Sequence, residues 1–584
     1  MTNVAADTAA TFCATLADEW QRGGVCDAVV CPGSRSTPLA LALARQEGIR
    51  VSVRLDERGA GYFGVGLALA SGRPVVILTT SGTAAAELHA AAVEAHHARV
   101  PLIICTADRP PELHDVGAAQ TIDQVHLYGR AVRWFANPGV PDDAGRHAWR
   151  SLASRAVAEA LHGPLGPGPV HLNLAFREPL LGAAGPLPPP RATGGTWHDV
   201  HRSLDMGLAG VRDYLRPSAR GVIVVGGGRG VDAVDALGAE LGWPVLADPR
   251  SGCRTGAPHV VGAADAVLRD ERFATEMLPE VVLRCGDPWA SKVLGGWLSR
   301  SANEGAVHVA LDSDWAWNDA GREVAVRVGG GQAPGSGSTP GRAGAWLGRW
   351  IEAEAAAQGA IDRVLDATPD ASEPGVARAL FAAAPCDGTI VVSSSMPVRD
   401  LEWFARPRPR PPRVLSNRGA NGIDGVVSTT LGAAACGTAG PVFGLVGDLA
   451  VLHDASALVR PVSGAPPMAA VIVVLDNWGG GIFNFLPQAR DLDEVEFEQL
   501  FGTPQLPAVA DLVRGCGFFV TELTAAAEFL PAVSTAGDEA SRSAMPAFVV
   551  VHTERKANVA LHARIEAAVL EALSGLRTDG AGDA

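Results

Sequence analysis

The stretch PVFGLVGDLA, residues 441–450, is an apolar run that ends at an acidic residue, and AVIVVLDNWGGG, residues 470–481, ends in a similar way. Short, continuous Val/Ile/Leu runs indicate strands buried on both faces, as in a parallel sheet. The polar residues that follow them then lie at one edge of the sheet, where such sheets bind ligands. Asp448 and the side-chain oxygen of Asn477 are hard oxygen ligands. With carbonyls of the glycine turn, a water and oxygens of a bound ligand, they would complete the octahedron that Mg²⁺ demands.

Similar runs recur along the whole chain of 584 residues. They include DAVVCPG, PVVILTT, PLIICTA, GVIVVGGG and TIVVSSS, and Ala-rich helical patterns separate them. We therefore predict an α/β fold in which each domain is a mostly parallel sheet flanked by helices. At roughly 150 residues per domain, the length suggests three or four domains. Pro- and Gly-rich stretches at 181–196 and 329–345 read as linkers, which predicts domains at 1–182, 197–330 and 346–575.

The first and last of these domains contain a similar unit. SGRPVVILTTSGT at 71–83 and TAGPVFGLVGDLA at 438–450 both run from a Gly/Pro turn through a strand to a second polar turn. A helix and another strand follow in each case. Any two strand–helix–strand units look partly alike, so the similarity leaves open whether the two domains share one topology.

Composition limits the classes of function. The net charge of −15, from 48 basic and 63 acidic residues, argues against a general nucleic-acid binder. No uninterrupted apolar run reaches the roughly 18 residues that suggest a membrane span. The nine cysteines show no C-x-x-C pair and no zinc spacing, and the N-terminal stretch lacks the basic region of a signal peptide. We therefore expect a cytoplasmic protein with reduced cysteines and no membrane or nucleic-acid partner.

The two polar strand ends resemble the signature of thiamine-diphosphate (ThDP) enzymes, which is Gly-Asp-Gly followed one strand later by Asn-Asn. This chain has Gly447-Asp448-Leu449 and Asp476-Asn477, so two positions of the signature differ while the two metal-side residues are retained. The resemblance implies the three-domain ThDP-enzyme fold: a pyrimidine-binding domain, a middle domain and a diphosphate-binding domain. It also implies ThDP and Mg²⁺ or Mn²⁺ as cofactors.

The stretch RLDERGAGYF, residues 54–63, places two carboxylates where a helix rich in small residues begins. Asp56 could simply cap that helix, and Glu57 could interact favourably with its positive N-terminal end. In ThDP enzymes a glutamate at such a junction hydrogen-bonds the aminopyrimidine ring and promotes the tautomer that takes the C2 proton. The resemblance assigns this role to Glu57 and leaves the cap to Asp56. An apolar pocket would raise the pKa of Glu57, and the small residues after it would give the ring close access.

Further motifs lie within about residues 1–180 and 385–490, namely CPGSRSTPLALAL, ADRPPELHDVGAAQTIDQ, SSSMPVRD, SNRGANGIDG and GGGIFNFLP. They resemble one family of ThDP enzymes, the 2-succinyl-5-enolpyruvyl-6-hydroxy-3-cyclohexene-1-carboxylate synthases of menaquinone biosynthesis (the MenD family). The resemblance implies a transferase that decarboxylates 2-oxoglutarate on ThDP and adds the resulting succinyl unit to isochorismate. It also implies a homodimer or a dimer of dimers.

The same resemblance assigns roles to individual residues. For substrate binding it implies a mostly basic and polar set: Ser34, Arg35, Arg109, Gln120, Lys292, Ser395, Arg399, Arg418 and Phe483. For catalysis it implies Glu57 together with part of that set: Arg35, Arg109, Gln120, Ser395, Arg399 and Arg418. For the cofactor it adds strand-end, turn and wall residues to Glu57: Thr80, Ser81, Gly82, Ile423, Gly447, Asp448, Leu449, Asn477, Gly479, Gly480, Ile482 and Phe483. The metal ligands would be Asp448, Asn477 and Gly479. Ala119 and Val293 depart from the family pattern, and both departures affect the part of the pocket that is expected to bind isochorismate.

Three alternatives compete with this interpretation. The chain could be another ThDP-dependent 2-oxoacid lyase, such as an acetolactate-synthase-like enzyme, which would favour pyruvate and could bind FAD. It could also be a ThDP-fold regulator without chemistry, although Glu57, Asp448 and Asn477 argue against that. Finally, the glycines at 226–230 follow a strand and suggest a dinucleotide loop, but they lack the G-x-G-x-x-G spacing and a clear acidic partner.

Overall fold

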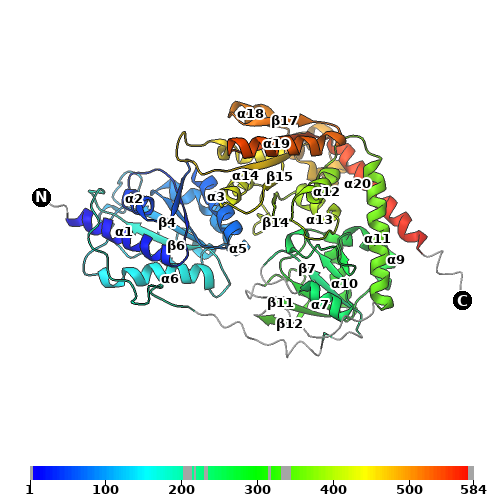
Figure 1. Cartoon of the computed structure of the whole chain (residues 1–584), viewed down its shortest axis with the longest axis horizontal. Coiled ribbons are helices and arrows are strands. Elements are labelled where there is room, and N and C mark those ends of the chain that lie inside the picture. Colours follow the sequence, from blue (N-terminus) through cyan, green and yellow to red (C-terminus); the bar gives the residue numbers. More distant parts are fainter. Residues whose placement is uncertain are drawn as a thin grey trace. The chain divides into compact units, whose positions relative to one another are not determined.

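The structure is a computed structural model, and it describes residues 4–200, 214–215, 219–228, 234–312, 317–329 and 344–576. Within these residues the strands form three six-stranded sheets, and the observed pairings are parallel (Figure 1). The α/β prediction is therefore confirmed. The predicted linker at 181–196 contains no helix or strand, whereas residues 330–343 of the second linker lie outside the described residues.

The first sheet has the strand order β2-β1-β3-β4-β6-β5. Its strands are β1 (Asp27–Val30), β2 (Arg50–Val53), β3 (Val75–Thr79), β4 (Leu102–Asp108), β5 (Phe135–Ala136) and β6 (Val170–Ala175). One face is covered by α1 (Val4–Arg22), α2 (Thr37–Arg45) and α6 (Trp149–His162). The other face packs against α3 (Glu57–Ser71), which contacts α4 (Thr83–Glu87) and α5 (His89–Ala98).

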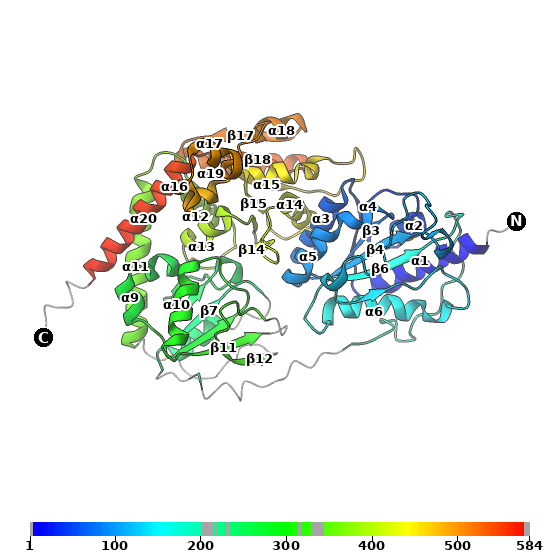
Figure 2. The same cartoon turned by 180° about the vertical axis from the view of Figure 1, so that it is seen from behind.

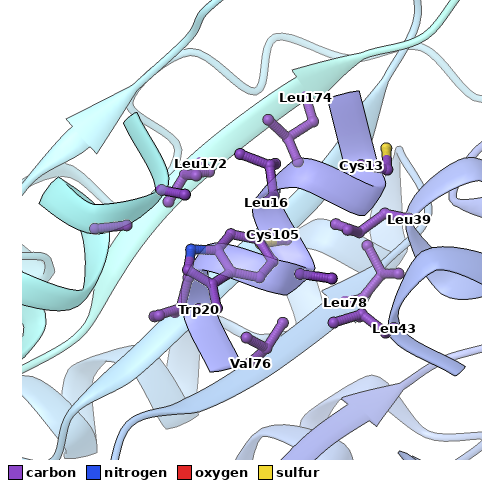
Figure 3. Close-up of a cluster of buried hydrophobic side chains, with 14 of the residues drawn as sticks. Cys13, Leu16, Trp20, Leu39, Leu43, Val76, Leu78, Cys105, Leu172 and Leu174 are labelled. Carbon is purple, nitrogen blue, oxygen red and sulfur yellow. The ribbon is translucent and has the colours of Figure 1, made fainter. Parts of the chain in front are cut away.

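The core on the α1 face shows why the strands of this domain are apolar along their whole length. Leu16 and Trp20 of α1 are fully buried among side chains of the central strands, including Val76 and Leu172 (Figure 3). Successive strand residues point to opposite faces, so Ile77, next to Val76, faces α3 instead. Each fully buried side chain of this size contributes about 1.5–3 kcal/mol relative to its exposed form.

The third sheet has the order β14-β13-β15-β16-β18-β17. Its strands are β13 (Thr389–Val392), β14 (Arg413–Ser416), β15 (Val442–Gly447), β16 (Ala470–Asp476), β17 (Phe519–Leu523) and β18 (Ala547–His552). If the six strands of each sheet are numbered by their order along the chain, the first and third sheets have the same spatial order, 2-1-3-4-6-5. The internal similarity in the sequence therefore reflects a shared topology.

The third predicted domain, 346–575, contains the helices α12 (Glu373–Ala383), α13 (Met396–Phe404), α14 (Val426–Ala435), α15 (Asp448–His453), α18 (Val509–Gly515) and α19 (Phe529–Ser543). The long helices α11 (Ala345–Asp366) and α20 (Arg555–Gly575) lie side by side (Figure 2). None of the helices in the described part of the chain is both long and apolar enough to cross a membrane.

The middle sheet has the order β9-β8-β7-β10-β11-β12. Its strands are β7 (Gly221–Val225), β8 (Val245–Ala247), β9 (Val260–Val261), β10 (Val281–Cys285), β11 (Val307–Asp312) and β12 (Val324–Gly329). Its helices are α7 (Val234–Leu241), α8 (Ala264–Leu268), α9 (Glu271–Glu276) and α10 (Lys292–Asn303).

The strand order of the middle sheet is that of dinucleotide-binding sheets. The glycine loop has another use, however, because a Cβ on Gly226 would lie 1.6 Å from the carbonyl oxygen of Asp287. Gly226 thus lets two strand-end loops pack together, while residues 229 and 230 lie outside the described residues.

The chain divides into two compact units. The first comprises the described residues of Met1–Arg202, Asn417–Thr438 and Ala450–Ala470, and the second those of Ser203–Ser416, Ala439–Leu449 and Val471–Ala584. Helix α14 lies within the third domain predicted from the sequence, but it is part of the first unit, where it packs along α3. The domain limits predicted from the linkers stay a prediction.

Small residues make the contact between α3 and α14 possible. A Cβ on Gly66 would lie 2.0 Å from the carbonyl oxygen of Thr429, and one on Gly432 would lie 2.1 Å from that of Phe63. Each helix thus brings a glycine against the backbone of the other. Gly66 thus serves helix packing, and Gly61 and Gly64 contact Ala91 and Ile77. That the small residues after Glu57 also give a cofactor ring close access stays a prediction.

Candidate active site

The predicted metal-side residues lie at the carboxyl ends of two neighbouring strands in the second unit. Strand β15 ends at Gly447, so that Asp448 begins α15, and β16 ends at Asp476, directly before Asn477. Both side chains are buried, with 5% of Asp448 and 9% of Asn477 exposed. The backbone N–H of Gly479 donates a hydrogen bond of 2.7 Å to Oδ2 of Asp448. The turn after β16 thus holds the carboxylate at the end of β15.

The oxygen of the Asn477 side chain fits a cation. Its Nδ2 donates to Oε1 of Glu373 at 2.7 Å, whereas its Oδ1 is buried and has no hydrogen-bond partner in the described part of the chain. Burial, together with the charge of Asp476, raises the pKa of Asp448 to about 7. A cation would compensate both groups, because it offers a partner to the orphaned oxygen and favours the charged carboxylate.

No group of three or more His, Cys, Asp or Glu side chains suited to a metal occurs among the described residues. A cation at Asp448 and Asn477 would therefore depend on amide, backbone and diphosphate oxygens in addition to one carboxylate. That is the ligand set of a bound metal–diphosphate pair rather than of an all-protein metal site.

Ser395 and Arg399 lie at the same edge of the third sheet. Strand β13 pairs with β15, and helix α13 starts directly after β13 and its short turn. Ser395 has φ of +72°, an uncommon conformation for a residue with a side chain, and such strain concentrates at functional sites. The guanidinium of Arg399 donates to the carbonyl oxygen of Ser395 at 2.5 Å.

Other predicted residues of the second unit lie in the turn that follows β16 and at the start of α10. Ile482 and Phe483 are half-buried in the 3₁₀ turn Gly481–Phe485, and the ring centroid of Phe483 lies 5.4 Å from that of Phe501. The backbone N–H of Gly480 is already bonded to the carbonyl of Gly502. Lys292 is exposed at the first position of α10.

In the first unit, four predicted residues meet where β3 and β4 end. Arg109 donates to the hydroxyl of Ser81 and, at 3.0 Å, to the carbonyl oxygen of Gln120. The amide of Gln120 donates to the carbonyl of Ser81 at 3.0 Å, and Gly82 adopts φ of +83° beside it. Burial lowers the pKa of Arg109, and the charge of the nearby Arg35 lowers it further.

This cluster is suited to an anion. Arg35 is buried, and it donates to the carbonyl of Phe176 and to the carboxylate of Glu178, which is largely exposed. Its Nε is buried without a hydrogen-bond partner among the described residues. Two neighbouring guanidiniums with an unused donor would be stabilised by a carboxylate, which matches the fork of arginine. Ser34 is exposed in the turn before α2, and Thr80 is buried against Gly33.

Glu57 is the first residue of α3, as expected. The side chain of Asp56 accepts a hydrogen bond from the backbone N–H of Arg58, so Asp56 is the N-cap and that prediction is confirmed. Glu57 is therefore not required as a cap. Burial raises its pKa, and the nearby acidic residues Asp56 and Glu87 raise it further. A carboxyl group that holds its proton more strongly suits proton sharing with a ring nitrogen.

Arg418 and Ile423 belong to a loop of the first unit that the buried carboxylate of Glu94 anchors. Glu94, on α5, accepts hydrogen bonds of 2.8 and 2.7 Å from the backbone N–H groups of Gly419 and Ala420. Tyr62 of α3 donates to Asp424 farther along the loop. The loop is thus tied to two helices of the first unit, one of which begins at Glu57.

Sequence reasoning missed Glu94 and Glu373. Both are 1% exposed, and each contacts a segment that carries predicted site residues. In the sequence Glu94 lies in an Ala-rich helical pattern, and Glu373 stands in a Ser-Glu-Pro sequence that is typical of a helix start. Neither pattern indicates a buried carboxylate.

Comparison with known proteins identifies the class. The family described as thiamine pyrophosphate enzyme, N-terminal TPP binding domain, matches residues 10–127. The fold is similar to that of the ThDP-dependent 4-hydroxybenzoylformate decarboxylase of Rhodococcus jostii, with a TM-score of 0.66 and 17% identity over 93% of this chain and 99% of that one. The chain thus has the three-domain fold of ThDP enzymes, with one parallel sheet in each domain.

Closer relatives define the family. The 2-succinyl-5-enolpyruvyl-6-hydroxy-3-cyclohexene-1-carboxylate synthase of Chloroflexus aurantiacus is 41% identical over 96% of both chains. The enzyme of the same name from Thermobifida fusca is 42% identical over 96% of this chain and 98% of its own. The chain belongs to this family, the MenD family. An acetolactate-synthase-like protein is not favoured.

Proposed function

We propose that the chain decarboxylates 2-oxoglutarate and transfers the remaining succinyl unit to isochorismate, giving 2-succinyl-5-enolpyruvyl-6-hydroxy-3-cyclohexene-1-carboxylate for menaquinone biosynthesis. The observation that carries this proposal is the full-length similarity to enzymes of that name. The paired guanidiniums of Arg35 and Arg109 support it, because both substrates are polycarboxylates.

The most direct experiment measures CO₂ release from 2-oxoglutarate by the ThDP-loaded protein, with and without isochorismate. We expect turnover with both substrates present and little or no release from pyruvate. Preferential use of pyruvate, or a purified protein that is yellow with bound flavin, would favour the acetolactate-synthase-like alternative. No CO₂ from either oxoacid would leave a non-catalytic regulator as the better interpretation.

Within this function we assign the cofactor to two sets of residues. Asp448, Asn477 and the backbone at Gly479 would hold Mg²⁺ or Mn²⁺ and through it the diphosphate, since they supply the hard oxygens described above. The carboxyl of Glu57 would share a proton with the aminopyrimidine ring. When bound, ThDP supplies the electron sink that makes decarboxylation of a 2-oxoacid feasible.

Four arginines would recognise the carboxylates, and each is expected to matter. Arg35, Arg109, Arg399 or Arg418 replaced by alanine should lower kcat/KM for at least one substrate by about tenfold or more. That is the scale of a hydrogen bond to a charged group, roughly 1.5–3 kcal/mol. Replacement by lysine should restore activity only in part, because the planar fork is lost.

Steady-state kinetics with each substrate varied in turn checks this expectation. Arg177→Ala is a suitable control, since Arg177 forms an exposed ion pair with Glu112 and surface pairs contribute little. If all four alanine variants kept wild-type kinetics for both substrates, the arginines would be structural and the substrate assignment would be wrong.

We further propose at least a homodimer, in which the pyrimidine-binding domain of one chain and the diphosphate-binding domain of another serve one cofactor. Glu57 and Asp448 belong to different compact units, which is compatible with such sharing. Glu57→Gln and Asp448→Ala variants, each inactive alone, should then regain activity when mixed and allowed to exchange subunits. For random dimers the recovery approaches about a quarter of wild-type activity. A fully active monomer in light scattering would refute the proposal.

A cytoplasmic location is also proposed. All nine cysteines are free, as expected for a reducing compartment. Fractionation of cells that produce the chain, followed by immunoblotting, tests the location directly.

A further inference from the structure

The side chain of Asn477 is held on two sides. On one side its Nδ2 donates to Glu373 at 2.7 Å. On another, a Cβ on Gly481 would lie 2.6 Å from Nδ2, so only glycine at this position leaves room for the amide. The remaining atom, Oδ1, is buried and has no partner among the described residues. The amide is therefore fixed, with one N–H group bonded to Glu373 and with its oxygen lacking a partner among the described residues.

We propose that Glu373 is a positioning residue for the metal site, which keeps the oxygen of Asn477, rather than its NH₂ group, turned toward the cation. This inference rests on the proposed role of Asn477 as a metal ligand. An asparagine amide presents an acceptor at one end and two donors at the other, and the two ends have nearly the same shape. Turned by half a rotation, the amide would direct N–H groups at a cation and bind it poorly. A carboxylate at the opposite end excludes that orientation, because it accepts hydrogen bonds but does not donate them.

Glu373 is itself fixed firmly enough for this task. It is 1% exposed and is the first residue of α12, whose N-cap Ser372 accepts a hydrogen bond from the backbone N–H of Gly375. The hydroxyl of Thr553 donates to the same oxygen that Asn477 uses, at 3.3 Å. The contact joins residues 104 positions apart in the sequence, so it links the start of α12 to the end of β16.

A second role for Glu373 has to be separated from the first. A buried carboxylate near a cation could strengthen metal binding simply through its charge. Two conservative variants distinguish the two roles. Glu373→Gln removes the charge but keeps a carbonyl oxygen at the same reach. Glu373→Asp keeps the charge but withdraws the acceptor by one carbon–carbon bond, about 1.5 Å, which breaks the hydrogen bond.

The test measures the dissociation constant of Mn²⁺ for the full-length protein with saturating ThDP, by loss of the electron paramagnetic resonance signal of free Mn²⁺. Positioning predicts that Glu373→Asp, which loses the hydrogen bond, binds Mn²⁺ on the order of 10–100-fold more weakly, the usual effect of residues that orient metal ligands. Glu373→Gln keeps an acceptor at the same reach but adds N–H donors, so it should lose less Mn²⁺ affinity than Glu373→Asp. Circular dichroism confirms that each variant is folded. Ser372→Ala is the matched control, because it weakens the same helix end without touching Asn477.

Each other outcome overturns the proposal. Weaker Mn²⁺ binding in Glu373→Gln than in Glu373→Asp would show that the charge matters and the orientation does not. Unchanged binding in both, or an equal loss in Ser372→Ala, would reduce Glu373 to a structural role. Asn477→Ala is measured in parallel: if it leaves Mn²⁺ affinity unchanged, the proposed metal site fails, and if it weakens binding while both Glu373 variants do not, only the positioning role fails.

Discussion

Asp448→Ala and Asn477→Ala are each expected to abolish metal-dependent binding of ThDP while the chain stays folded. Asp448 supplies the only carboxylate proposed as a metal ligand, and Asn477 supplies a buried oxygen without another partner in the described chain. Neither ligand can be replaced by the diphosphate, since its oxygens already occupy other positions around the cation. Isothermal titration calorimetry with ThDP, in the presence and absence of Mg²⁺, measures the effect.

Asp511→Ala provides the control, because Asp511 is exposed and lies on the surface helix α18 of the same unit. Substitutions of this kind usually change stability by less than about 0.5 kcal/mol. Unchanged ThDP affinity in both test variants would remove the metal assignment. A loss of affinity that occurs equally without Mg²⁺ would instead indicate that these residues support the fold of the turn.

Glu57→Gln is expected to bind ThDP normally and to slow the exchange of its C2 proton by several orders of magnitude. The proton-sharing group is lost, because glutamine cannot accept and return a proton as a carboxyl does. Glutamine keeps the size of the side chain and its hydrogen-bonding reach. Rapid-quench NMR of the C2 proton in deuterated buffer measures the exchange rate.

Asp56→Asn is the matched control for this experiment. Asparagine caps a helix as well as aspartate does, so α3 should keep its start while one charge at the same junction is removed. We expect exchange close to the wild-type rate in Asp56→Asn. Exchange at the wild-type rate in Glu57→Gln would assign Glu57 to the electrostatics of the helix end.

The sequence was sufficient for the features that depend on local pattern. Val/Ile/Leu runs such as 442–447 became buried parallel strands, because a strand covered on both faces must be apolar throughout. The N-cap at Asp56 followed from its position before a helical run. The shared strand order of the first and third sheets was visible as a repeat but could not be separated from chance similarity until the pairings were known.

Features that depend on distant contacts could not be predicted. Glu373 and Glu94 bind groups that are 104 and 325 positions away, and nothing near them in the sequence marks them as buried. The packing role of Gly66 could not be predicted for the same reason, since its partner helix α14 comes from the last third of the chain. Predicted roles of individual site residues, which rest on family resemblance, stay predictions.

The reciprocal glycine contacts between α3 and α14 have a consequence for sequence variation. Gly66 and Gly432 each face a carbonyl oxygen of the opposite helix, so one added methyl group at either position pushes two backbones apart. Helix α3 begins at Glu57, and α14 follows the loop of Arg418. Such a displacement would therefore move the helix start at Glu57 and the loop that carries Arg418 at the same time. In a survey of tolerated substitutions, these two glycines would look as constrained as residues that contact a ligand.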